Sequence, residues 1–215
     1  MEQFKVKGVI FDFNGTLFWD TQYNNKAWDS FLEMHGFRLS DKEKLEIIHG
    51  KNNQDSISEL FGGRLNLEEL HRLSRQKEEL YRKFCLEGKP ELAPGAIDFL
   101  GFLMKNNIPF TLATASIAEN IDFYFEHLDL GRYFDKDKVV FNDGVIQSKP
   151  HPAYYQKAMM ILGLRKEETL VFEDSFAGIS SAENAGVARI IIVNSNNDDY
   201  GMWNYQVIKD FREVM

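Results

Sequence analysis

Four short polar clusters in this chain contain the residue types that act on phosphate groups. Their members are Asp12, Asn14 and Thr16; Thr114 and Ser116; Lys149; and Glu173, Asp174 and Ser175. Three clusters directly follow apolar runs that predict strands, and Lys149 lies a few residues beyond another such run. Because the carboxyl ends of parallel strands meet at one edge of a sheet, we expect all four clusters in one site.

Phosphoryl transfer uses these residue types. A carboxylate such as Asp12 attacks phosphorus and forms an acyl phosphate. Since both reacting groups are anionic, the reaction needs a divalent cation, and Asp12 and Asp174, with Glu173 acting through water, would hold Mg²⁺. Lys149 would place a positive charge on the nucleophile and the phosphoryl oxygens. Thr114 would donate a hydrogen bond to the same oxygens.

The turn after Asp12 favours the same interpretation, because Gly15 permits a close backbone approach that leaves an amide facing the phosphate. Each cluster alone also has a purely structural explanation. Asp-x-Asn-Gly forms turns with side-chain hydrogen bonds, and the hydroxyls and acidic residues of the later clusters cap helices. An EF-hand calcium loop starts similarly, but its glycine spacing and closing glutamate are missing. All four clusters together, at strand ends, favour a site.

The apolar runs predict the parallel sheet that this site needs. Strands are expected at Val9–Phe13, Phe110–Ala113, Val139–Phe141, Leu170–Phe172 and Arg189–Val193, with helices at Ile117–Leu128, Ala153–Leu162 and Ala177–Ala185. Strands that alternate with helices at this spacing indicate an α/β fold with helices on both faces of the sheet. The polar segment Asn194–Asn204 predicts a loop, and a short helix is expected near Ile208–Val214.

Residues 18–90 contain no convincing strand signal. Helical spacing of apolar residues instead predicts helices at Asn24–Met34, Asp41–His49, Gln54–Leu60 and Leu67–Cys85. A further helix, Ala96–Lys105, follows Pro94 and Gly95. We therefore expect a core formed by residues 1–17 and 92–215, with a helical insertion of residues 18–91 after the first strand.

Composition limits the class of protein. A length of 215 residues suits one large domain or a core with a modest insertion. The formal net charge of −8 disfavours binding to nucleic-acid backbones. Cys85 is the single cysteine, which excludes an internal disulfide and suits a reducing cytoplasm. No signal-peptide pattern and no run of about 18 apolar residues occur, so a cytoplasmic protein without membrane segments is expected.

The four clusters also resemble the signature motifs of the haloacid dehalogenase-like (HAD) hydrolase superfamily. The matching segments are Phe11–Leu17, Leu112–Ser116, Ser148–Pro150 and Val171–Ser175. The resemblance covers the whole chain, including the helical insertion after the first motif, which corresponds to a cap domain. It is strongest to the β-phosphoglucomutase-like branch. It implies a Rossmann-like core and a phosphohydrolase acting on a small phosphorylated molecule, such as a sugar phosphate.

The same resemblance implies roles for individual residues. Asp12 would be the nucleophile, Asp174 and the main-chain carbonyl of Asn14 would be metal ligands, and Glu173 would lie in the outer shell of the metal. Gly15, Thr16, Thr114, Ala115, Ser116 and Lys149 would hold the phosphoryl group. Lys77 would match a substrate-binding lysine of the cap, although a solvated helix face is the simpler explanation of that residue.

Asn14 departs from the family pattern, which usually has an aspartate at this position. That aspartate protonates the leaving oxygen and later deprotonates the attacking water. An amide cannot act as a general acid or base, so the rate of turnover could be lower by roughly 10²–10⁴-fold. A trapping substitution, a natural variant suited to good leaving groups and a non-catalytic binder would each explain Asn14. Metal binding through its main chain should persist.

The residues of the expected cap domain help to distinguish a phosphatase from a mutase. In the mutase, a histidine lies on the first cap helix, and an arginine lies in a later cap loop that grips the distal phosphate. Asn24 and Asn53 occupy the matching positions here. We therefore expect hydrolysis of a monophosphate. A phosphosugar isomerase and a weakly catalytic phosphosugar-binding or regulatory protein remain as alternatives. The chain lacks the Gly-x-Ser-x-Gly motif of serine hydrolases and the phosphate-binding loop of NTPases.

Overall fold

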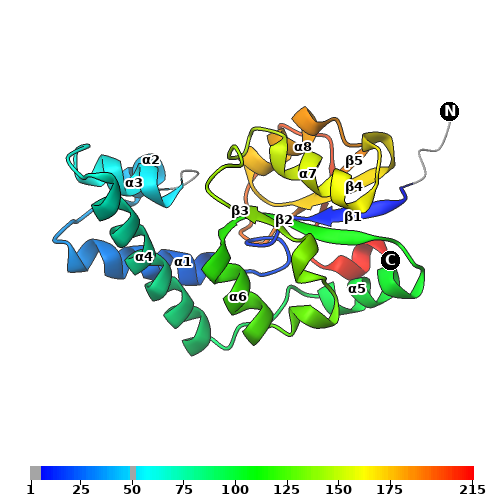
Figure 1. Cartoon of the computed structure of the whole chain (residues 1–215), viewed down its shortest axis with the longest axis horizontal. Coiled ribbons are helices and arrows are strands. Elements are labelled where there is room, and N and C mark those ends of the chain that lie inside the picture. Colours follow the sequence, from blue (N-terminus) through cyan, green and yellow to red (C-terminus); the bar gives the residue numbers. More distant parts are fainter. Residues whose placement is uncertain (1–5, 49–51) are drawn as a thin grey trace. The chain divides into compact units, whose positions relative to one another are not determined.

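The computed structural model describes residues 6–48 and 52–215. The chain forms two compact units, Met1–Trp19 with Pro90–Met215 and, between them in sequence, Asp20–Lys89 (Figure 1). The division expected from the sequence, after residue 17 and before residue 92, lies within a few residues of these limits. The function of the second unit as a cap domain stays a proposal.

Among the described residues, the first unit contains a six-stranded parallel sheet in the order β3-β2-β1-β4-β5-β6. The strands are β1 (Gly8–Phe11), β2 (Phe110–Ile117), β3 (Val140–Asn142), β4 (Thr169–Glu173), β5 (Arg189–Val193) and β6 (Gln206–Ile208). Every residue of the two central strands, β1 and β4, is buried. Their largely apolar sequence is typical of strands covered on both faces. The predicted α/β class is thereby confirmed.

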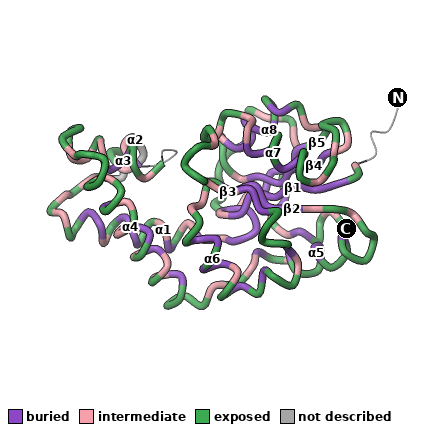
Figure 2. The backbone as a smooth tube through the Cα atoms, in the orientation of Figure 1, coloured by how far each residue is buried: buried purple, intermediate pink, exposed green. Residues whose placement is uncertain are grey.

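Helices cover both faces of the sheet, and alternate residues of the central strands point to opposite sides. The helices are α5 (Ala96–Lys105), α6 (Ala118–His127), α7 (Ala153–Leu162) and α8 (Phe176–Ala185). Ile10 and Val171 pack with residues of α7 and α8. Phe11 and Phe172 stack with centroids 5.1 Å apart and contact the rings of Phe99 on α5 and Phe211 near the C-terminus. Figure 2 shows this buried centre around the strands.

Two strands of the core differ from the predictions. Strand β2 continues to Ile117, four residues beyond its predicted end, so the second polar cluster lies on the last part of the strand. At the C-terminus, the strand β6 was missed, whereas the expected short helix near Ile208–Val214 is found as a 3₁₀ helix at Phe211–Val214. Two of the three β6 residues are exposed. A strand that short has no detectable hydrophobic period, which explains the miss.

The second unit consists of helices with an apolar core of its own. Its described helices are α1 (Thr21–Met34), α2 (Asp41–Ile47), α3 (Asn53–Leu60) and α4 (Leu67–Glu87). The predicted helix ending at His49 extends beyond the described residues. Trp28, Phe31, Leu32 and Leu73 form the centre of the buried cluster. No helix within residues 6–48 and 52–215 has the length and apolarity that crossing a membrane requires.

Candidate active site

The sheet brings the four polar clusters together, as the topology predicted. Asp12 directly follows β1, Thr114 and Ser116 lie near the end of β2, and Glu173 is the last residue of β4. Lys149 lies in the connection between β3 and α7 and reaches two of these strand ends. This edge is where parallel sheets place their ligands.

Lys149 joins two carboxylates at the centre of the site. Its Nζ atom lies 2.6 Å from Asp12 Oδ1 and 2.5 Å from Glu173 Oε1. Its side chain is only 8% exposed, so these contacts are made largely out of water. Burial alone would lower the pKa of Lys149, but the charges of Asp12 and Glu173 outweigh it and raise the pKa well above its usual value. The lysine is therefore charged and holds the proposed nucleophile.

Glu173 is fully buried and both of its carboxylate oxygens are held by donors. Oε1 accepts from Lys149 and from the hydroxyl of Tyr155 at 2.9 Å. Oε2 accepts from the main-chain amides of Asp174 at 2.8 Å and Ser175 at 2.7 Å, and from the Ser175 hydroxyl at 3.1 Å. A buried charge requires this degree of compensation. Glu173 thus fixes both Lys149 and the turn that carries Asp174.

The close packing around Glu173 depends on Gly178 of α8. A Cβ atom at this position would lie 1.6 Å from Glu173 Oε1, so Gly178→Ala must displace the carboxylate. We expect the substitution to lower the free energy of unfolding by about 1–3 kcal/mol. Urea unfolding monitored by circular dichroism would measure this. Gly101→Ala is the matched control, because a Cβ atom there meets no atom within 4 Å. In addition, alanine has a higher helix propensity than glycine at an exposed position. Equal stabilities of the two variants would contradict the prediction.

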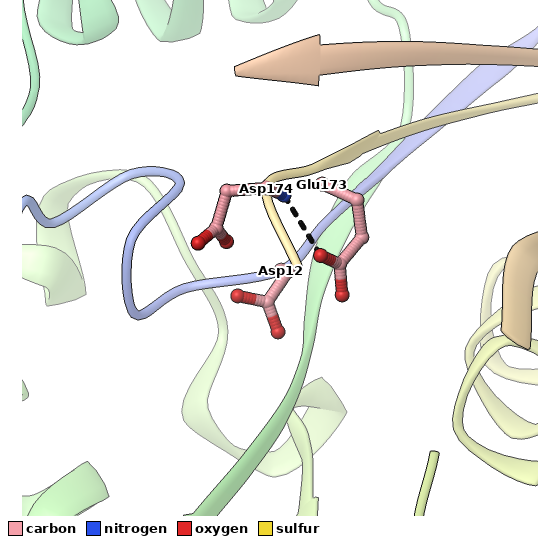
Figure 3. A group of neighbouring side chains, drawn as sticks. All are labelled: Asp12, Glu173 and Asp174. Atoms are coloured by element: carbon pink, nitrogen blue, oxygen red, sulfur yellow. Dashed lines mark hydrogen bonds between the residues drawn. The ribbon is translucent and has the colours of Figure 1, made fainter. Parts of the chain in front are cut away.

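Asp174 completes a group of three carboxylates. Single oxygens of Asp12, Glu173 and Asp174 all lie within 4.8 Å of one another (Figure 3). Thr16 Oγ1 donates to Asp174 Oδ1 at 2.8 Å, and a Cβ at Gly15, whose φ is +79°, would lie 2.1 Å from Asp174 Oδ2. Burial and the charges of Glu173 and Asp12 raise the pKa of Asp174 well above its usual range. Lys149 balances one of the three charges, so this donor set fits one divalent cation.

Asn14 belongs to a hydrogen-bonded group with residues of β2 and α6. Its Nδ2 atom donates to the hydroxyl of Tyr124 at 2.9 Å, and its Oδ1 atom accepts from Ser116 Oγ at 2.6 Å. Thr114 Oγ1 lies 3.5 Å from the same oxygen. Tyr124 packs on Phe13 with ring centroids 4.5 Å apart. These partners set the orientation of the amide at the position where an acid–base residue was expected.

Comparisons with known proteins identify the family of this chain. The family model for haloacid dehalogenase-like hydrolases matches residues 9–192. The chain belongs to this family. The Escherichia coli hexitol phosphatase A is 30% identical over 194 residues, which cover 90% of this chain and 86% of the relative. A phosphorylated carbohydrates phosphatase of Thermotoga maritima is 28% identical, with 90% and 88% covered. The family and its phosphohydrolase class, expected from the sequence, are confirmed.

Solved structures show the same HAD fold. A HAD hydrolase, family IA, variant 3, from Entamoeba histolytica has a TM-score of 0.90 and 32% identity, with 98% of this chain and 96% of that chain covered. A β-phosphoglucomutase of Clostridium difficile and a putative β-phosphoglucomutase of Thermotoga maritima share the fold as well. The chain spans about half the length, 51%, of a 25% identical relative, the chloroplastic 5-amino-6-(5-phospho-D-ribitylamino)uracil phosphatase of Arabidopsis thaliana.

Some contacts of this HAD hydrolase differ from the sequence-based expectations. The amide of Gly15 itself donates to the carbonyl of Phe18 at 2.7 Å, and the expectation that the turn leaves an amide facing the phosphate stays a prediction. The missing side chain of Gly15 instead makes room for Asp174. Thr16 likewise contacts Asp174, whereas Ala115 is exposed at the end of β2. The phosphate-binding roles assigned to these three residues remain predictions.

The simpler explanation of Lys77, a solvated helix face, was wrong. Lys77 is only 2% exposed, and its Nζ atom donates to Asn24 Oδ1 at 2.5 Å and to Glu78 Oε1 at 3.1 Å. The rings of Trp28 and Tyr81 lie 5.4 Å from the same atom. The lysine therefore belongs to the polar interior of the second unit, and its contact with a substrate stays a prediction.

Two tyrosines of the site were missed by reasoning from the sequence. Tyr124 lies on the buried face of α6, and Tyr155 lies on the buried face of α7. Both follow the helical period of ordinary core residues, and only their hydroxyl partners, Asn14 and Glu173, distinguish them. The one signal in the sequence that could have indicated them is that the helices carrying these tyrosines are expected to pack beside the strand ends that form the site.

Proposed function

We propose that this HAD hydrolase is a Mg²⁺-dependent phosphatase that hydrolyses a small phosphorylated carbohydrate through an aspartyl-phosphate on Asp12. One observation carries the proposal: the 2.6 Å contact between Asp12 and the buried, charged Lys149, inside a group of three carboxylates. A lysine held against a carboxylate at a strand end suits attack on an anionic group, because it offsets the charge of both reactants.

Mg²⁺ would be held by the carboxylates of Asp12 and Asp174 and by the main-chain carbonyl of Asn14, with Glu173 in the outer shell. Oxygen donors of this kind are those that Mg²⁺ takes in proteins. When bound, the ion supplies positive charge that reduces the repulsion between the nucleophile and the phosphate. The many donors on Glu173 support its outer role, since both of its oxygens already bind protein groups.

In the proposed reaction, a carboxylate oxygen of Asp12 attacks phosphorus, and the bond to the leaving oxygen breaks. Lys149 and Thr114 hold the phosphoryl oxygens during this step. The amide of Asn14 donates a hydrogen bond but no proton, so the leaving oxygen takes its proton from water. A second water then attacks phosphorus and gives a proton to the hydroxide that the first water left; the bond between phosphorus and the Asp12 oxygen breaks, which releases inorganic phosphate and restores the carboxylate.

The substrate class is proposed from the relatives and from the second unit. Two relatives are named as phosphatases of hexitols and of phosphorylated carbohydrates. Within the second unit, Asn24 binds Lys77 and Asn53 binds Glu78, so these positions present neutral amides already held by neighbours. Neither amide supplies the charge that a second phosphate would need. We therefore propose a sugar or polyol monophosphate as the substrate.

A phosphosugar-binding or regulatory role is the second candidate, and Asn14 is the observation that favours it. Without an acid–base carboxylate at that position, the site keeps its means of binding phosphate and loses a means of turnover. Binding should then stabilise the chain without product release. For either role we also propose a cytoplasmic location, based on the single cysteine, and no nucleic-acid partner, based on the net charge of −8.

A panel of phosphorylated metabolites tests the proposal. Release of inorganic phosphate would be measured for sugar phosphates, polyol phosphates and an aryl phosphate, each with Mg²⁺ and with a chelator. Release that requires Mg²⁺ and favours a carbohydrate monophosphate supports the phosphatase. Thermal stabilisation by these ligands with no release of phosphate would favour the binding role, and interconversion of hexose phosphates would favour the isomerase.

The raised pKa of Asp174 predicts how pH and Mg²⁺ act together. A carboxyl whose pKa is higher in the folded chain contributes stability that is complete below its unfolded pKa and is lost as pH rises through the folded value. Without metal, this contribution should decline as pH rises above about 4. Mg²⁺ requires the deprotonated form. We therefore expect the Mg²⁺-induced increase in Tm to grow with pH. Scanning calorimetry at several pH values would measure it, and Asp174→Asn should remove the trend.

A further inference from the structure

The segment between β5 and β6 brings a tyrosine to the proposed metal site from outside the four motifs. We propose that Tyr200 is a positioning residue that fixes Asp174 for cation binding. Its hydroxyl donates to the main-chain carbonyl of Asp174 at 2.5 Å, and the residue as a whole is only 5% exposed. This inference rests on the proposed function, because it assigns Tyr200 to the metal site of that reaction.

Asp174 needs to be held because its neighbours repel it. Single oxygens of Asp12, Glu173 and Asp174 lie within 4.8 Å of one another, and like charges at such a distance repel. The contacts on Asp174 come from three directions: its amide donates to Glu173, its carboxylate accepts from Thr16, and its carbonyl accepts from Tyr200. The hydroxyl of Tyr200 fixes the peptide between Asp174 and Ser175. That peptide sets the direction in which the carboxylate leaves the backbone.

Tyr200 is itself well supported. Its ring packs with Ile179 and Ile192 in a small core cluster. It also meets Phe176 edge-to-face with centroids 5.6 Å apart, and Phe176 contacts Trp203 at 5.1 Å. Burial raises the pKa of Tyr200, and the nearby charge of Asp174 adds to the effect. The hydroxyl therefore keeps its proton and remains a donor at neutral pH.

The backbone that carries Tyr200 is also held in place. The side-chain amide of Asn194 makes two hydrogen bonds with the main chain of Asp198. Its Nδ2 atom donates to the carbonyl of Asp198, and its Oδ1 atom accepts from the amide of Asp198, each at 3.0 Å. After the tyrosine, the amide of Trp203 donates to the carbonyl of Tyr200 at 2.9 Å. The loop thus presents Tyr200 in one conformation, which an orienting contact requires.

Tyr200→Phe tests the inference, because it keeps the ring and removes only the hydroxyl. Calorimetric titration of the full chain with Mg²⁺ should show an affinity about 10-fold weaker, as found when a group that orients a metal ligand is lost. Turnover should recover at saturating Mg²⁺, a rescue that a purely structural role would not give. Tyr205→Phe is the control, since its hydroxyl donates to Glu183 on the surface. That variant should bind Mg²⁺ like the unaltered chain.

The outcomes separate this inference from the proposed function. Equal Mg²⁺ affinities for Tyr200→Phe and the unaltered chain would overturn the role of Tyr200 and leave the phosphatase proposal intact. An equal loss of affinity in Tyr205→Phe would overturn that role as well. No Mg²⁺ binding by the unaltered chain would overturn both proposals. Circular dichroism of each variant establishes that the comparison is made between folded proteins.

Discussion

Asn14→Asp is expected to raise the rate of sugar phosphate hydrolysis by roughly 10²–10⁴-fold, the usual contribution of general acid–base catalysis. The present amide is oriented by Tyr124 and Ser116, at 2.9 and 2.6 Å, so a carboxylate of the same shape would occupy a position that is already fixed. There it could protonate the leaving oxygen and then deprotonate the attacking water.

Comparing two substrates with different leaving groups would show whether the added carboxylate acts as a general acid. An alkoxide leaving group needs a proton, whereas an aryl oxide leaves without one. The gain in Asn14→Asp should therefore be large for a sugar phosphate and small for the first step with an aryl phosphate. The rate of leaving-group release during the first turnover, followed by rapid quenching with both substrates, would measure the difference. Asn196→Asp adds the same charge at an exposed position and should leave both rates unchanged. No gain with either substrate would mean that the amide does not limit turnover.

Asp12→Asn is expected to reduce phosphate release to background, a fall on the order of 10⁴-fold or more, comparable to losses of a nucleophile in other enzymes. An amide at this position cannot form the acyl phosphate. The fold should survive, because Lys149 keeps its 2.5 Å contact with Glu173 and is not left without a counter-charge. Urea unfolding of both proteins would check this.

Mass spectrometry of acid-quenched reactions would test the nucleophile directly. Because Asn14 cannot activate water, the unaltered chain should accumulate one phosphoryl group, and a peptide map should place it on Asp12. Asp12→Asn should carry none. The matched control is Asp137→Asn, which changes an exposed carboxylate and should retain full activity. A phosphoryl group that persists in Asp12→Asn, or undiminished phosphate release, would refute the assignment.

The sheet and most of the site were predictable because their signals are local. Strands β1, β4 and β5 are short, largely apolar runs that are buried over almost their whole length. The polar residues that end them are adjacent in sequence to those runs. Their meeting at one edge then follows from parallel pairing alone. Asp12, Glu173 and Asp174 were found in this way.

The remaining parts depend on contacts between distant residues, which a single sequence does not encode in a readable form. Tyr124 and Tyr200 enter the site by way of helix packing and loop conformation, and their local patterns match those of core tyrosines. For Lys77 the error was to expect exposure, because a lysine on a helix is usually exposed. Its burial is made possible by contacts with Glu78, Asn24 and nearby aromatic rings, which are not apparent from the sequence.

One backbone hydrogen bond, from the amide of Ala93 to the carbonyl of Leu17 at 2.8 Å, has a consequence for how such a chain evolves. The bond joins the two stretches of the first unit that lead into and out of residues 20–89. Those residues therefore begin and end at almost the same point in space, like the two ends of a tight turn. The entropic cost of closing such an excursion rises only slowly with its length. Segments of very different size can be exchanged there by recombination, while the strand ends that carry Asp12 and Asp174 keep their spacing.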